Sequence, residues 1–91
     1  MKVRYILNVS YKSPEKVDRT FELKLLSIAK RHHGVEGGSG FGFVDQRRDF
    51  DIIFHSQKNA RKTRRRVVAY RKFKVKATLW RADGSNMVSI P

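Results

Sequence analysis

The hydrophobic residues of this 91-residue chain change their spacing several times, and each spacing is typical of one kind of secondary structure. Apolar residues at every second position indicate a strand with one buried face, whereas apolar residues three or four positions apart indicate one face of a helix. The first spacing occurs at Val3, Tyr5, Leu7 and Val9. The chain therefore begins with a predicted strand, and later changes of spacing predict the order of the other elements.

A first helix is predicted to follow this strand. The Ser-Pro-Glu sequence at positions 13–15 is typical of a helix start, with a hydroxyl N-cap, proline at the first helical position and an acid in the first turn. Its apolar face consists of Val17, Phe21, Leu25, Ile28 and His32. Gly34 is predicted to end the helix in the left-handed conformation, which glycine adopts readily.

A hairpin and a second helix are predicted next. Residues 41–44 and 50–54 alternate between apolar and other side chains and flank the polar segment 45–48, a pattern typical of a hairpin. Ser56 then provides an N-cap hydroxyl for a helix over residues 57–71. The apolar face of this helix consists of Ala60, Thr63, Val67 and Tyr70.

The end of the chain is predicted to be a second hairpin. Residues 73–80 alternate, Asp83-Gly84 is a turn signal, and residues 87–90 form the returning strand. The predicted order is β-α-β-β-α-β with a C-terminal hairpin strand. That order indicates a ferredoxin-like α+β sandwich, in which an antiparallel sheet carries two helices on one face. We expect residues 1–91 to form one domain, because the length leaves no room for two cores.

A short motif lies on the first strand of the central hairpin. Gly40-Phe41-Gly42-Phe43-Val44 resembles the RNP1 signature of the RNA recognition motif, with Ser39 and Gln46 replacing its terminal basic and aromatic residues. The resemblance implies that Phe41 and Phe43 contact RNA. In that family, however, the RNP1 strand directly precedes the second helix, whereas residues 50–54 intervene here. The strand order therefore favours a core position for both rings.

Positive charge is concentrated in the second part of the chain. Residues 1–51 contain 10 Lys and Arg and 7 acidic residues, whereas residues 52–91 contain 11 Lys and Arg and the single acid Asp83. Concentrated like charge opposes folding by self-repulsion, which a bound polyanion relieves. The net charge is +13. The charge distribution favours a nucleic-acid partner, although a basic protein without such a partner remains an alternative.

We predict a small non-enzymatic protein that binds nucleic acid, with RNA or single-stranded DNA slightly preferred. The basic side of the second helix would contact phosphates, and the open sheet face would add a platform combining basic residues with an aromatic one. The predicted contact residues are Lys58, Arg61, Lys62, Arg65, Arg66, Arg71, Lys72, Lys74, Lys76, Arg4 and Trp80. We expect weak sequence specificity, because no base-reading arrangement of Asn or Gln is evident.

A partner of a different class remains open. The same basic surface suits an inhibitor or adaptor that docks on an acidic protein, for example a phage-encoded protein acting on a host nuclease or CRISPR effector. Leu23 and Leu26 fall outside the apolar face of the first helix. These leucines, or an edge strand, would also allow a homodimer contact.

The sequence offers little material for catalysis or for cofactor binding. It contains no cysteine, which excludes disulfides, thiolate zinc sites and a cysteine nucleophile. Asp49 and Asp51 share one strand face and are the best candidates for a Mg²⁺-dependent nuclease site. Without a third carboxylate at an evident spacing, we expect them to form surface ion pairs with Arg4 and Lys74 instead. We predict no catalytic residue, metal or cofactor.

Hydropathy bears on location. No apolar run approaches the roughly 18–20 residues of a membrane span, and no apolar stretch typical of a signal peptide follows the basic start. We therefore expect a soluble, cytoplasmic protein without a membrane partner.

Overall fold

A computed structural model describes residues 3–12, 19–42, 47–70 and 75–91 of the chain. In these residues, strands and helices follow one another in the order that the spacing of apolar residues predicts. Their bounds are β1 Arg4–Lys12, α1 Arg19–Arg31, β2 Val35–Gly42, β3 Arg47–Phe54, α2 Gln57–Val68, β4 Val75–Asp83 and β5 Asn86–Ile90.

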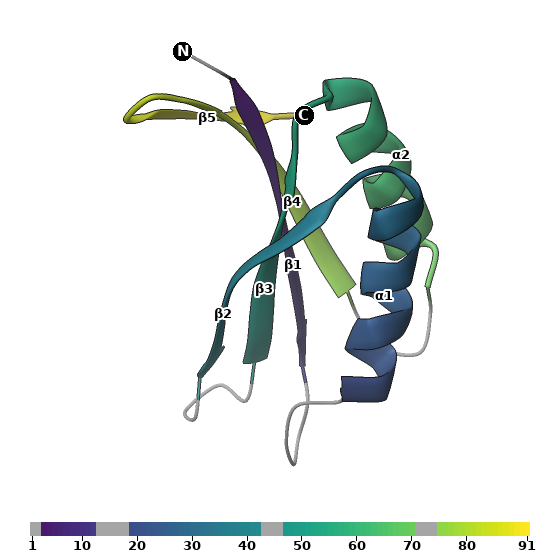
Figure 1. Ribbon diagram of the computed structural model, residues 1–91. Coiled ribbons are helices and arrows are strands. Elements are labelled where there is room, and N and C mark those ends of the chain that lie inside the picture. Colours follow the sequence, from purple (N-terminus) through teal and green to yellow (C-terminus); the bar gives the residue numbers. More distant parts are fainter. Residues whose placement is uncertain (1–2, 13–18, 43–46, 71–74) are drawn as a thin grey trace.

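The five strands form one sheet in the order β2-β3-β1-β4-β5, and every neighbouring pair is antiparallel. Both helices cover the same face of this sheet, and no described element covers the other face (Figure 1). The predicted ferredoxin-like α+β architecture, with its additional C-terminal strand, is therefore confirmed. None of the described helices has the length and apolar character needed to cross a membrane.

The core lies between the sheet and the helix layer. Side chains alternate between the two faces of a strand, so residues of one parity on β1 and β3 point toward the helices. The fully buried side chains of these strands and of α1 include Leu7, Val9, Tyr11, Ile52, Phe54, Phe21 and Leu25. Among the side chains that the apolar spacing predicts to be packed, Phe21, Leu25, Ile52 and Val67 are confirmed by their burial. Tyr5 and Ile28 are partly buried against the core, and Val17 lies outside the described residues.

The end of α1 differs from its prediction. His33, with a φ of 63°, adopts the left-handed conformation that was predicted for Gly34. The His33 N–H donates to the Lys30 carbonyl at 3.1 Å and the Gly34 N–H donates to the Ala29 carbonyl at 2.8 Å, the two bonds of a Schellman motif. Glycine is needed at position 34 for another reason: a Cβ there would lie 2.7 Å from the Phe54 ring. The predicted N-terminal signal at 13–15 lies outside the described residues.

The start of α2 agrees with its prediction, whereas its end does not. The Ser56 Oγ accepts a hydrogen bond from the Asn59 N–H at 3.3 Å, as expected of an N-cap. The helix ends at Val68 rather than at residue 71. The Tyr70 N–H bonds the carbonyl of Val67, three residues back, instead of continuing the four-residue pattern.

Both hairpins form, with changes in register. The strand β2 begins at Val35, well before the predicted residue 41, and a register shift between Glu36 and Ser39 accommodates the glycine-rich segment. In the second hairpin Asp83 pairs with Asn86, so the two-residue turn is shifted by one residue from the predicted one. Gly84 adopts a φ of 63° in this turn, a conformation that favours glycine.

The motif that resembles RNP1 begins on β2, at the edge of the sheet. The strand that directly precedes α2 is β3. The position that the RNA recognition motif gives to RNP1 is therefore not reproduced. Phe43 and the side chain of Phe41 lie outside the described residues, and their predicted core position stays a prediction.

Candidate nucleic-acid interface

The solvent side of α2 is strongly basic. Ala60, Thr63 and Val67 are fully buried on the side that faces the sheet, which turns the charged positions outward. The exposed cations of the helix are Lys58, Arg61, Lys62, Arg65 and Arg66. The sequence of α2 contains no acidic residue, so none of this charge is neutralised within the helix. The structure thus brings five predicted contact residues onto one helix.

One arginine of α2 has a different role. The Arg64 guanidinium donates hydrogen bonds to the backbone carbonyls of Ile90, at 3.3 Å, and Pro91, at 2.8 Å. Arg64 therefore attaches the end of β5 to α2, and we do not include it among the phosphate-contact candidates.

The first helix adds cations that the sequence analysis did not select. Lys24, Lys30 and Arg31 are exposed on α1, which packs beside α2 on the same face of the sheet. The predicted fold could have identified these residues, because two helices on one face of a sheet share one outer surface. We call the exposed cations of both helices, apart from the glutamate-paired Arg19, the basic helix surface. It is defined as Lys24, Lys30, Arg31, Lys58, Arg61, Lys62, Arg65 and Arg66.

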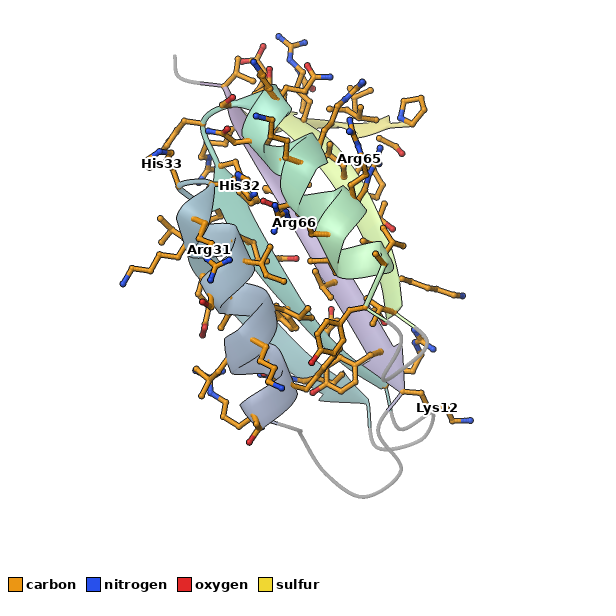
Figure 2. The ribbon with its side chains drawn as sticks, turned by 90° about the vertical axis from the view of Figure 1, so that its right-hand side faces the viewer. Lys12, Arg31, His32, His33, Arg65 and Arg66 are labelled. Atoms are coloured by element: carbon orange, nitrogen blue, oxygen red, sulfur yellow. The ribbon has the colours of Figure 1, made fainter. Side chains whose placement is uncertain are left out.

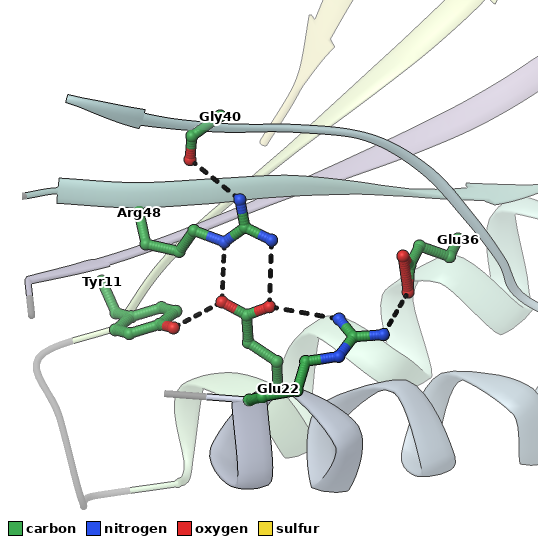
Figure 3. Close-up of polar contacts among 6 residues, drawn as sticks. Tyr11, Glu22, Glu36, Gly40 and Arg48 are labelled. Carbon is green, nitrogen blue, oxygen red and sulfur yellow. Dashed lines mark hydrogen bonds and ion pairs between the residues drawn. The ribbon is translucent and has the colours of Figure 1, made fainter. Parts of the chain in front are cut away.

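The only acidic residue of α1 and α2 is withdrawn from this surface. Glu22 is 1% exposed and accepts hydrogen bonds from Arg48 Nε at 2.7 Å and Nη2 at 3.1 Å (Figure 3). The Tyr11 hydroxyl also donates to this carboxylate, and Arg19 donates at 3.4 Å. Burial by itself raises the pKa of Glu22, but the hydrogen bonds from Arg48 and Tyr11 outweigh it and hold this pKa below its ordinary value. The ionised carboxylate is therefore paired internally and does not repel an anion at the helix surface.

Part of the basic helix surface lies at the seam between the two helices. His32 is half-buried at the end of α1 (Figure 2). Partial burial, followed by the charges of Arg66 and Lys62 on α2 and of His33 and Arg31 on α1, lowers the pKa of His32. The sequence analysis assigned His32 only to an apolar helix face. The approach of α2 changes its environment.

The other predicted contact residues do not join this surface. Arg4, Lys76 and Trp80 lie on the open sheet face, opposite Ala82, Ser10 and Ile6 respectively in the register. The predicted set is therefore divided between two faces of the molecule. Arg71, Lys72 and Lys74 lie outside the described residues.

The open sheet face carries charges of both signs. Asp51 accepts a hydrogen bond from the Asn8 Nδ2 at 2.8 Å. The predicted ion pair of Arg4 with Asp49 or Asp51 is wrong, because Arg4 lies at the opposite end of β1 from their partners Ser10 and Asn8. Lys74, the other residue expected to pair with these aspartates, lies outside the described residues. Across the described ranges, no group of three or more His, Asp or Glu side chains is placed to hold a metal ion.

The two leucines singled out on the first helix differ in environment. Leu23 is 53% exposed, as predicted, whereas Leu26 packs against the hydrophobic core. The prediction that Leu26 lies off the packed face is therefore wrong, because the helix layer also buries the flank of α1. Of the two, Leu23 remains available to a protein partner.

Comparisons with known proteins bear on the fold. No protein-family model and no curated protein sequence matches this chain. The formyltetrahydrofolate deformylase from Burkholderia mallei ATCC 23344 matches 84% of this chain with a TM-score of 0.58 and 14% identity, but this chain spans only 27% of that one. A protein described as a putative PII-like signaling protein from Thermus thermophilus matches 99% of this chain with a TM-score of 0.62 and 15% identity, over 92% of its own chain. At such identities the likeness shows the fold alone, and this chain has the ferredoxin-like α+β fold.

Proposed function

We propose that this protein binds nucleic acid non-enzymatically, through phosphate contacts along the basic helix surface. One observation carries the proposal: the charged side chains exposed on α1 and α2 are all cationic, and their single carboxylate, Glu22, is buried and paired. Nucleic acid presents closely spaced phosphates, and cations that neutralise them release condensed counterions. A helix layer whose exposed charges are all cationic suits such a ligand.

Contacts of this kind position a nucleic acid without reading its sequence. We therefore propose weak sequence specificity. The slight preference for RNA or single-stranded DNA rests on the open sheet face, where Trp80 lies beside Ile6 in a half-exposed position. An aromatic side chain at such a position offers a stacking surface to unpaired bases.

An acidic protein is the second candidate partner. Leu23 and Val68 are 53% and 51% exposed on the two helices. Exposed apolar residues contribute more to protein interfaces than to phosphate contacts. An inhibitor or adaptor that docks on an acidic partner would use these residues together with the same cations.

Binding measurements separate these candidates. Labelled single-stranded RNA, single-stranded DNA and duplex DNA are titrated with the protein at two salt concentrations. We expect affinity to fall steeply with salt for every nucleic acid that binds. In the R61Q/R65Q/R66Q variant, affinity should fall for all sequences alike, and the log–log salt slope should shrink by about one unit for each phosphate that the variant no longer neutralises.

A matched variant controls for net charge. R4Q/K12Q/K76Q removes the same formal charge from the open sheet face. A larger effect of the helix variant supports the basic helix surface, whereas a larger effect of the sheet variant moves the site to the open face. Absence of binding to all three nucleic acids at low salt contradicts the proposal and favours the acidic protein partner.

A further inference from the structure

We propose that the seam between α1 and α2 forms a seat for a single phosphate group, built from His32, Lys62 and Arg66, and that His32 takes up a proton when the phosphate binds. This inference rests on the proposed function, because the phosphate would belong to the nucleic-acid backbone. It assigns one phosphate contact to named residues of the basic helix surface, and it makes binding affinity depend on pH.

The position of His32 is fixed by a well-bonded helix end. Its N–H donates to the Ala29 carbonyl at 2.9 Å, and the Gly34 N–H donates to the same carbonyl at 2.8 Å. A Cβ at Gly34 would lie 2.7 Å from Phe54, so this end of the helix packs closely on the sheet. The half-buried imidazole is therefore carried by a backbone that is hydrogen-bonded and packed against the sheet.

The second helix presents two cations to this imidazole. Lys62 and Arg66 are four residues apart, so they lie one above the other on one side of α2. Figure 2 shows Arg66 at the seam between the helices, close to His32 and Arg31, whereas Arg65 lies on the side of α2 away from α1.

The groups that act on His32 come from α2 and from the end of α1. They are Arg66 and Lys62 on α2, and His33 and Arg31 on α1; together with partial burial, they lower the pKa of His32. Glu36, the carboxylate on the adjacent strand β2, pairs instead with Arg19 at 3.7 Å. In the free protein these neighbours therefore disfavour the charged form of the imidazole.

A bound phosphate changes the electrostatic environment of His32 from one that disfavours the protonated imidazole to one that favours it. The Arg66 guanidinium and the Lys62 ammonium donate to the phosphate oxygens, and the negative charge now favours a protonated imidazole. His32 takes one proton from solvent and becomes a further donor to the anion. Because protonation and binding are linked, affinity rises as the pH falls, and the part contributed by protonated His32 is lost as the pH rises through the pKa of His32 in the complex.

The inference is tested by NMR titration of the three histidines. Two probes are used, inorganic sulfate and a short oligothymidylate, since neither sulfate nor a phosphodiester titrates over about pH 5 to 8, where histidine does. We expect either probe to raise the pKa of His32 by about one unit, which corresponds to an about tenfold change in affinity across the titration. Exposed His55 should not respond.

Two variants with the same loss of charge locate the effect. K62Q/R66Q should abolish the response of His32 to sulfate. R61Q/R65Q removes two cations of the same helix, each one position earlier, and should retain that response even though its overall affinity for the oligonucleotide falls. An unchanged response in K62Q/R66Q would overturn the seat.

The outcomes for the two proposals differ. Oligothymidylate binding without a change at His32 overturns the seat and leaves nucleic-acid binding intact. A response to sulfate, without binding of oligothymidylate or of the three nucleic acids above, supports an isolated anion site and contradicts the proposed function. Absence of a His32 response to both probes overturns the seat, and absence of binding to all three nucleic acids as well contradicts both proposals.

Discussion

Arg48 on β3 holds the carboxylate of Glu22 on α1 in a two-pronged contact, with Nε 2.7 Å from one oxygen and Nη2 3.1 Å from the other (Figure 3). The planar guanidinium matches the carboxylate geometry, which strengthens the pair. The Glu22 side chain is 1% exposed and that of Arg48 is 13% exposed. This contact joins the helix layer to the sheet, and it also removes the one carboxylate of α1 from the basic helix surface.

Loss of Arg48 should be strongly destabilising. Arg48→Met leaves the buried Glu22 without its main partner, and we expect the free energy of unfolding in urea to fall by about 3–5 kcal/mol. The control is the double variant Glu22→Leu with Arg48→Met, which replaces the ion pair by apolar side chains. It should recover most of the loss, and a double variant as unstable as the single one would contradict this account.

The same pair makes stability depend on pH. Because the pKa of Glu22 is lowered in the folded protein, the unfolded state binds the proton more readily, and acid favours unfolding. The contribution is fully present above the ordinary glutamate pKa of about 4.3 and is lost as the pH falls through the lower folded value. Urea unfolding at a series of pH values should show a steeper decline below this point for the native chain than for Glu22→Gln. Parallel curves would rule out the assigned role.

A glycine at position 33, at the end of α1, should stabilise the folded protein. His33 adopts a φ of 63°, which costs a residue with a Cβ about 1–2 kcal/mol, so His33→Gly should raise the free energy of unfolding by about 1 kcal/mol. Gly34→Ala should lower it by about 1–3 kcal/mol, because the new methyl group would meet the Phe54 ring. Thermal unfolding of the two variants measures both effects. The opposite order of stability would contradict the assigned geometry.

Phe21 should be a major contributor to stability. Its ring is fully buried, contacts Tyr11 edge-on at a centroid distance of 4.9 Å, and lies 5.2 Å from Tyr70. Phe21→Ala should cost about 3–5 kcal/mol in a denaturant melt, from lost burial and the cavity left behind. Leu23→Ala, an exposed position two residues later, serves as the control and should change stability little.

Charge removal from the basic helix surface should not harm the fold. Arg61, Arg65 and Arg66 are exposed, and like charges four residues apart, as in Arg61 and Arg65, repel by about 0.2–0.5 kcal/mol. The R61Q/R65Q/R66Q variant should therefore unfold at the same or a slightly higher urea concentration. Added salt should stabilise the native chain more than the variant, since screening relieves the same repulsion. A large loss of stability would show that these side chains have structural partners.

The spacing of apolar residues was sufficient for the order of elements and for much of the core. Alternation placed Leu7 and Val9 on the packed face of β1, and four-residue spacing placed Phe21 and Leu25 on that of α1. These relations are local, because backbone geometry alone determines which side chains share a face. The Ser56 cap was predictable for the same reason, since it involves residues only three positions apart.

The chain sequence by itself determined the element order, the buried faces and a basic outer side on the second helix. Only the tertiary structure decided that Glu22 is paired with Arg48 and that His32 faces Lys62 and Arg66. Each of these relations joins elements distant in the sequence. Electrostatic interactions depend on separation in space, which is set by how the helices pack on the sheet and not by the spacing of residues along the chain.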